Sequence, residues 1–204
     1  MADISPISLP PEAWKSKKTR RFATRHDTIR QLLVIEHPWH PSHEGGFGSW
    51  EMKLAPPAGA RPQEPLFVSF YQSDNYSGVW QEGAWTGVQA FIGHRFKQLL
   101  VNGHVVWEQD VADDEMIDPL DQPPGPGRTG YTDPYHIVEI PFIDASEIVL
   151  TWRVVDKVGS TTKLPGDAYQ RFSWSACNPH EAAKNFQTSV YFGDVHLTTS
   201  PQAV

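Results

Sequence analysis

The chain has 204 residues, including 15 Gly and 18 Pro, so it can form one domain with a real core and must turn often. Its 17 basic and 24 acidic side chains give a net charge of −7, which argues against nucleic acid as the main partner. No stretch approaches the roughly 18 apolar residues of a membrane span, and "MADISPISLPPEAW" lacks the apolar region of a signal peptide. We therefore expect a soluble protein without a membrane partner, cytoplasmic as the chain stands.

Cys177 is the single cysteine, so no intrachain disulfide can form and the fold has to be held by packing. Residues 1–30 are expected to form an irregular N-terminal arm, because Pro6, Pro10 and Pro11 oppose a helix. Residues 31–204 are expected to form a single β-sandwich domain. The arm is basic, while the rest of the chain carries 10 cations and 21 acids, a net charge of −11.

The first pattern, "DTIRQLLVIEH", fits a helix or a strand: its apolar run is short and ends at Pro38, and Leu32, Val34 and Ile35 slightly favour a strand. "WEMKLAP" predicts a second strand. "LFVSFYQ" alternates Leu66, Val68 and Phe70 on one face with Phe67, Ser69 and Tyr71 on the other, as in a strand inside a sandwich.

The stretch 96–112 predicts a β-hairpin, because Asn102-Gly103 suits a two-residue turn that needs φ > 0 at both positions. An unbroken register would pair Val101 with His104, Leu99 with Val106, and Lys97 with Glu108. One face would then gather four apolar side chains, those of Phe96, Leu100, Val105 and Trp107.

Residues 113–134 are too polar and proline-rich for a core element. Strands are predicted for "YHIVEIP", for "EIVLTWRVV" with Ile148, Leu150, Trp152 and Val154 on one face, and for "YQRFSWSA" and "TSVYFGDVHL". A short helix is expected at "PHEAAKNF". Many short strands with period-2 patterning and long connections predict an all-β fold, an antiparallel β-sandwich of jelly-roll type.

The order "RFKQLLVNGHVVWEQDVA … YHIVEIPFIDASEIVLTWRVVD … VYFGDVHL" resembles the galactose-binding-domain-like jelly rolls, which include carbohydrate-binding modules and the sugar-binding domain of family 2 glycosidases. Val101-Asn102-Gly103 matches the family's turn, "IVEIP" its edge strand and "EIVLTWRVV" its return strand. The likeness covers residues 66–198. It implies glycan binding, which still has to be argued from a site.

The loop "SDNYSGVWQEGAW" is the first candidate ligand site. Flat aromatic faces suit the apolar side of a sugar ring, and carboxylates and amides suit its hydroxyl groups. The loop supplies both, with Asp74, Asn75, Tyr76, Trp80, Gln81, Glu82 and Trp85. The alternative is a loop that buries its own aromatic rings under a sheet edge.

Two metal sites are also considered. By the resemblance, Glu51 and Asp194 occupy positions that could hold a structural Ca²⁺, and an ion pair of Asp194 with Arg95 or Arg153 is the alternative. In "HPWHPSHE", His37, His40 and His43 could bind Zn²⁺ with Glu44 as a base, although the prolines exclude the helical zinc motif. No other cofactor is expected.

The sequence thus predicts a non-catalytic carbohydrate-binding β-sandwich module, with a poly- or oligosaccharide as partner. The first alternative is a jelly-roll lyase or hydrolase acting on polysaccharide, and the second is a structural or protein-interaction domain. A homo-oligomer is compatible with any of the three.

Overall fold

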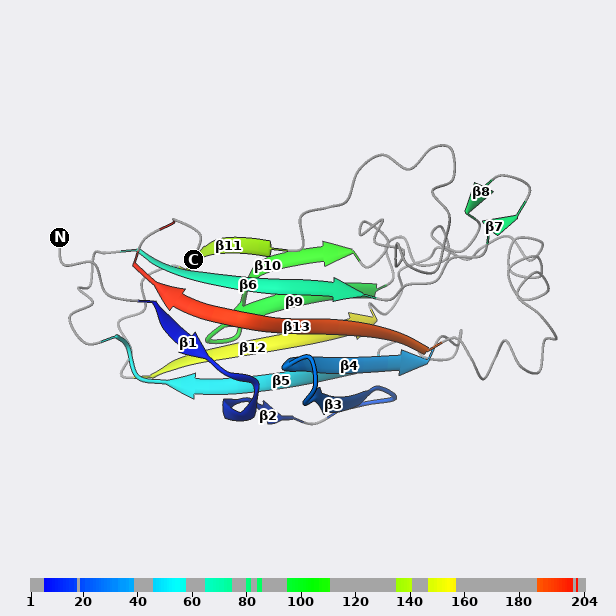
Figure 1. Cartoon of the computed structure of the whole chain (residues 1–204), viewed down its shortest axis with the longest axis horizontal. Helices are drawn as coiled ribbons and strands as arrows, with labels where there is room; N and C mark the ends of the chain where they lie inside the picture. The colour runs from blue at the N-terminus through cyan, green and yellow to red at the C-terminus, as the bar shows by residue number, and fades with distance from the viewer. Residues whose placement is uncertain are drawn as a thin grey trace.

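A computed structural model of the chain describes residues 6–17, 19–38, 46–57, 65–74, 80–81, 84–85, 95–110, 135–140, 147–156, 187–199 and 201. These residues form two antiparallel sheets and a small two-stranded ribbon. Figure 1 shows the strands of both sheets running roughly along the long axis of the molecule. The ribbon pairs β7 (Trp80–Gln81) with β8 (Ala84–Trp85).

The larger sheet, sheet A, has six strands. Its spatial order is β11 (Tyr135–Ile140), β6 (Leu66–Asp74), β13 (Gln187–Thr198), β4 (Leu32–Pro38) and β3 (Ala23–Asp27). β1 (Ile7–Leu9) pairs with β13 over Val195–Leu197, just beyond the part of β13 that β4 covers.

Sheet B has five strands, in the order β10 (His104–Asp110), β9 (Arg95–Val101), β12 (Ile148–Asp156), β5 (Phe47–Leu54) and β2 (Lys15–Ser16). The chain passes repeatedly from one sheet to the other, for example from β4 to β5 and from β5 to β6. The predicted antiparallel sandwich of jelly-roll type is therefore confirmed.

The core lies between the sheets and follows the predicted alternation. Leu66, Val68 and Phe70 of β6 are buried, and so are Ile148, Leu150, Trp152 and Val154 of β12. The strand predicted at "QLLVIEH" is β4, which ends at Pro38 as expected. Among the described residues the helical structure is limited to the three-residue 3-10 turn η1 (Pro11–Ala13), and none of it could cross a membrane.

Within the expected irregular arm, short strands join both sheets. β1 and β3 belong to sheet A and β2 to sheet B. Leu9, Trp14 and Phe22 are buried in the main core, and the Trp14 ring meets the Phe192 ring edge-on with centroids 5.4 Å apart. The N-terminal segment therefore closes one side of the core.

The hairpin of β9 and β10 forms around Asn102 and Gly103, whose φ angles of 47° and 85° are those the turn requires. Its predicted register is correct only from Val101–His104 to Leu100–Val105. A β-bulge then inserts one residue, so Leu99 faces Trp107 and Lys97 faces Gln109. The predicted Lys97–Glu108 pair is therefore wrong.

The bulge also corrects the predicted apolar face of the hairpin. Leu99 and Val101 belong to the main core, whereas Val105 is 45% exposed. Trp107 reaches the core because the inserted residue turns it inward, where its ring lies 5.3 Å from Phe70 and 5.7 Å from Trp152 between centroids. A single extra residue thus moves one large aromatic from one face of the strand to the other.

Candidate functional site

Two tyrosines lie side by side on the outer face of sheet A. Phe70 of β6 points into the core, so Tyr71 points outward, and the register places Tyr135 of β11 opposite it. The two ring centroids are 5.4 Å apart at an interplanar angle of 63°. Tyr135 is 57% exposed, and the Tyr71 hydroxyl donates to Ser73 Oγ at 2.9 Å. A pair of aromatic rings, one exposed and one half-buried, therefore stands at this edge of the sheet.

A β-bulge in β13 brings a carboxylate to the same face. Gly193 pairs with Tyr71 but His196 pairs with Ser69, so β13 contains one residue more than β6 over this interval. Asp194 lies at the bulge and has a φ of 48°. Its side chain points outward, while the next residue, Val195, points into the core again. His196 Nε2 lies 3.0 Å from Asp194 Oδ1, so an imidazole and a carboxylate form a pair beside the tyrosines.

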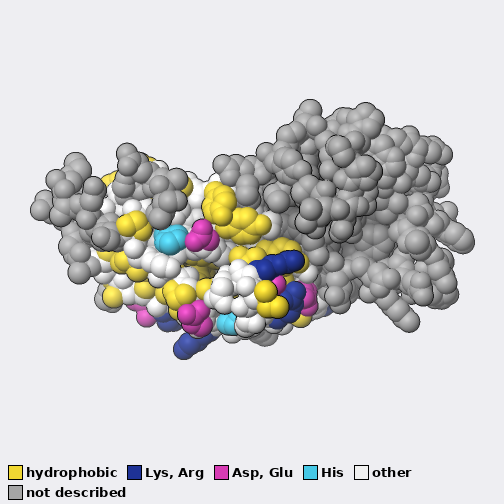
Figure 2. Space-filling view, in the orientation of Figure 1, with side chains coloured by type: hydrophobic (Ala, Val, Ile, Leu, Met, Phe, Trp, Pro, Cys, Tyr) yellow, Lys and Arg dark blue, Asp and Glu magenta, His cyan; other side chains and the backbone are white. Residues whose placement is uncertain are grey.

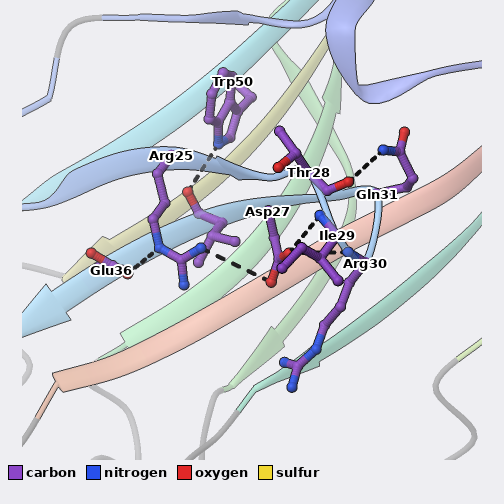
Figure 3. Close-up of polar contacts among 9 residues, drawn as sticks. Arg25, Asp27, Thr28, Ile29, Arg30, Gln31, Glu36 and Trp50 are labelled. Atoms are coloured by element: carbon purple, nitrogen blue, oxygen red, sulfur yellow. Dashed lines mark hydrogen bonds and ion pairs between the residues drawn. The ribbon is translucent and has the colours of Figure 1, made fainter.

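The turn between β3 and β4 supplies the opposite wall (Figure 3). Asp27 Oδ1 accepts hydrogen bonds from the backbone N–H groups of Ile29 at 3.2 Å and Arg30 at 3.0 Å. Gln31 Nε2 donates to the Thr28 carbonyl at 2.8 Å, and its own φ is 58°. These contacts fix the backbone from which the Arg30 side chain extends.

Arg25 of β3 contacts two carboxylates next to this turn. Its guanidinium Nε donates to Glu36 Oε1 at 2.5 Å, and its Nη1 lies 4.0 Å from Asp27 Oδ2. The hydrogen bond with Glu36 raises the pKa of Arg25. The backbone hydrogen bonds from Arg30 and then Ile29 lower the pKa of Asp27, so the turn favours its ionised form.

Between these elements lies a groove of about 540 Å³, which we call the sheet-A groove. It is lined by residues 8–11, by the turn residues 30–32, by Tyr71 and Tyr135, and by Asp194 and Val195 of the bulge. In Figure 2, which views this side of the molecule, an acidic and a histidine side chain lie next to each other between apolar groups. The groove therefore combines apolar walls with a carboxylate, a guanidinium and an amide.

Gly193 sets the depth of the groove wall. A Cβ atom added there would lie 2.5 Å from Leu32 Cδ2 and 3.1 Å from the Gln31 carbonyl oxygen. A side chain at this position would force the Leu32 side chain to move and the Gln31 carbonyl to shift by a few tenths of an ångström. The close approach of the turn to β13, and with it the shape of the groove, depends on this glycine.

A second polar cluster lies inside the sandwich. Lys97 of β9 and Gln72 of β6 are both 0% exposed, and Lys97 Nζ donates to Gln72 Oε1 at 2.7 Å. Gln72 Nε2 is 3.2 Å from Gln109 Oε1 and 3.1 Å from His136 Nε2. This cluster joins the two sheets through side chains, because β6 belongs to sheet A and β9 to sheet B.

The predicted loop site lies almost wholly outside what the structure describes. Asn75, Tyr76 and Glu82 are outside the described residues, and for Asp74, Trp80, Gln81 and Trp85 the strand position alone is given. Asp74 ends β6, and Trp80 pairs with Trp85 in the ribbon of β7 and β8. The loop site remains a prediction.

The two predicted calcium ligands lie on different sheets. Glu51 of β5 neighbours the buried Trp50, so it points to the outer side of sheet B, and its Oε1 lies 2.8 Å from Lys17 Nζ. Asp194 points to the outer side of sheet A, and its Oδ1 lies 3.0 Å from His196 Nε2. Of the two arginines considered as partners, the Arg95 side chain lies outside what the structure describes. A calcium ion at either carboxylate would therefore need other ligands.

The zinc prediction falls mainly outside the described residues. His40 and His43 are not among them, and for His37 the structure gives the backbone position in β4. Within the described ranges, no three His, Cys, Asp or Glu side chains gather closely enough to hold a metal ion. Both metal sites remain predictions.

Sequence reasoning missed the sheet-A groove. Its walls come from segments far apart in the chain, around Gln31, Tyr71, Tyr135 and Asp194. One signal was present: Tyr71 and Tyr135 occupy outward positions of strands whose inward positions are mostly apolar, apart from Gln72 and His136. The pairing of those two strands could not be read from the pattern.

Comparison with known proteins adds little beyond the fold. No protein-family model matches the chain, and no curated protein sequence is similar to it. Among solved structures, it is similar to a carbohydrate-binding module, TmCBM27, that recognises mannan, with a TM-score of 0.46 and 12% identity, over 97% of this chain and 96% of that one. At this level of similarity neither the ligand nor the site of that module carries over to this chain.

Proposed function

We propose that the chain is a carbohydrate-binding β-sandwich that holds a glycan in the sheet-A groove. The observation that carries the proposal is the presence of two outward tyrosines, Tyr71 and Tyr135, in one groove with Asp194, Arg30 and Gln31. A sugar ring has an apolar C–H face and an equatorial fringe of hydroxyl groups. Such a ligand needs an aromatic surface together with charged and amide side chains.

Each wall of the groove has a role in this proposal. The exposed Tyr135 ring is the platform for the apolar side of a sugar, and Tyr71 supports it from the neighbouring strand. Asp194 accepts hydrogen bonds from hydroxyl groups, and Gln31 presents an amide from the facing turn. The platform is held by strands of a sheet, so little order has to be gained on binding.

The test is retention of the protein by a broad panel of poly- and oligosaccharides, followed by calorimetry on the ligands found. Tyr135→Ala should weaken binding about tenfold, because a truncated aromatic anchor typically costs more than 1 kcal/mol. Tyr135→Phe should retain most of the affinity if the ring face is the contact. Val105→Ala is the matched control, because Val105 is exposed on the other sheet.

The same screen separates this function from the others. Release of new reducing ends or unsaturated products would favour an enzyme. Unchanged binding in Tyr135→Ala combined with its loss in Trp80→Ala/Trp85→Ala would move the site to the predicted loop. Repeating the screen in EDTA tests the predicted calcium, since loss of binding on chelation and its return with Ca²⁺ would show that the ion is needed. Absence of retention on every glycan would overturn the proposal.

A further inference from the structure

The charged side chains of the sheet-A groove point to a more specific ligand, and this inference rests on the proposed function. The groove has two charged lining residues among those described, Arg30 and Asp194. They lie on different walls, one on the turn before β4 and the other on the bulge of β13. Their environments differ in a way that decides which of them is available to a charged ligand.

Asp194 already has a hydrogen-bond partner in the protein. Its Oδ1 atom lies 3.0 Å from His196 Nε2, and His196 is largely buried at the floor of the face, with 19% of its side chain exposed. The carboxylate is therefore held by a donor of the fold, and it can accept a sugar hydroxyl through its other oxygen. It does not need a cation from the ligand.

Arg30 differs from three other basic side chains of the described residues. Arg25, Lys17 and Lys53 each pair with a carboxylate of the protein, namely those of Glu36, Glu51 and Glu147. Among the described residues no carboxylate forms an ion pair with the Arg30 guanidinium, although the same residue gives its backbone N–H to Asp27. Figure 3 shows the Arg30 side chain leaving the turn with no ion pair drawn to the Asp27 carboxylate, although the charge of Arg30 contributes to the lowered pKa of Asp27.

The backbone under Arg30 is held in place. Asp27 fixes the two N–H groups that precede the side chain, and Gln31 returns its amide to the Thr28 carbonyl. A guanidinium on an ordered turn loses less conformational freedom when it binds than one on an unrestrained loop. Its planar array of N–H donors matches the two oxygens of a carboxylate or sulfate.

We infer that the sheet-A groove binds a glycan that carries an anionic substituent, with Arg30 on the anion and Tyr135 on the sugar ring. The anion is either the carboxylate of a uronic acid or a sulfate ester, since both present paired oxygens to a guanidinium. Asp194 and Gln31 then orient neutral hydroxyl groups of the same sugar or of the next one. The overall net charge of −7 makes a local basic contact necessary for any such ligand.

The experiment compares matched ligand pairs on the full chain by calorimetry. Oligosaccharides of polygalacturonate, alginate and hyaluronan are each measured against their methyl esters, which keep the backbone and remove the charge. A sulfated galactan is measured against its desulfated form. The wild type should bind at least one charged form about tenfold more tightly than its neutral partner, and the difference should shrink with added salt.

Variants assign that preference to Arg30. Arg30→Met should abolish the difference between the charged and neutral forms while the melting temperature stays unchanged, because the side chain is exposed. Arg30→Lys should retain part of it, since the charge remains but the paired donors are lost. Arg20→Met is the matched control, an exposed arginine outside the groove.

The outcomes separate this inference from the proposed function. Equal affinity for charged and neutral forms in the wild type, with binding that still depends on Tyr135, would overturn the inference and leave glycan binding intact. A preference that survives in Arg30→Met would overturn the role of Arg30. Preference for the sulfated galactan alone would assign the anion to a sulfate ester.

Discussion

Trp152 of β12 stacks face to face on Phe192 of β13, with ring centroids 4.3 Å apart and an interplanar angle of 9°. Both residues are 0% exposed, and they come from the central regions of the two opposing sheets. Phe70 of β6 approaches both rings, at 6.2 Å from Trp152 and 5.4 Å from Phe192. This aromatic group therefore joins the two layers at the centre of the core.

The first prediction concerns this contact. Phe192→Ala should lower the free energy of unfolding by about 3–5 kcal/mol, because it leaves a cavity beneath Trp152. Phe192→Leu should cost clearly less, since much of the volume is kept. Urea unfolding followed by Trp fluorescence measures both variants. Similar losses for Ala and Leu would mean that ring stacking, and not volume, provides the stability.

The second prediction concerns the buried pair of Lys97 and Gln72. Gln72→Leu should destabilise the fold by about 1–3 kcal/mol, because the ammonium loses an acceptor that water cannot replace. In a double-mutant cycle with Lys97→Met, the coupling energy should be at least about 0.5 kcal/mol. Additive losses in the double variant would show that the two side chains contribute independently.

The third prediction tests the groove wall at Gly193. Gly193→Ala should cost about 1–3 kcal/mol and weaken glycan binding, because its Cβ displaces Leu32 and the end of the turn. Gly103→Ala is the matched control. It should cost a similar amount through its φ of 85°, yet it lies in the hairpin turn with open space around it and should leave binding unchanged.

The fourth prediction is a pH dependence at Asp27. Its pKa is lowered in the folded state, so its contribution to stability is fully present above the unfolded value of about 3.9 and is lost as the pH falls through the lower folded value. The stability difference between wild type and Asp27→Asn should therefore shrink as the pH falls from about 5 into this acidic range. Urea unfolding at several pH values measures it. A difference that stays constant over this range would contradict the prediction.

Much of the fold could be predicted from the sequence because the strands are regular. The alternation of Leu66, Val68 and Phe70, and the same pattern in β12, identify inward positions without knowledge of their neighbours. The Asn102-Gly103 turn was likewise correct, since few residues other than Asn and Gly adopt these φ angles readily. The strand alternation and the hairpin turn both depend on residues that are close together in the sequence.

The parts that could not be predicted depend on single inserted residues and on distant pairings. The bulge before Trp107 shifts the hairpin register by one residue, and the pattern of apolar residues does not reveal it. Lys97 was expected to face Glu108, but it faces Gln109 and its buried ammonium donates to Gln72 on the opposite sheet. The sheet-A groove was missed for the same reason, since it exists only once five segments far apart in the sequence meet.

Gly193 also has a consequence for how the specificity of this protein could change. A side chain at Gly193 would press on the Leu32 side chain and the Gln31 carbonyl, so substitution there would cost stability as well as change the groove. The rim is different, because Tyr135 and Arg30 are exposed and their replacement disturbs no core packing. New ligand preferences could therefore arise from single substitutions of Tyr135 or Arg30, while the β-sandwich that carries them keeps its structure.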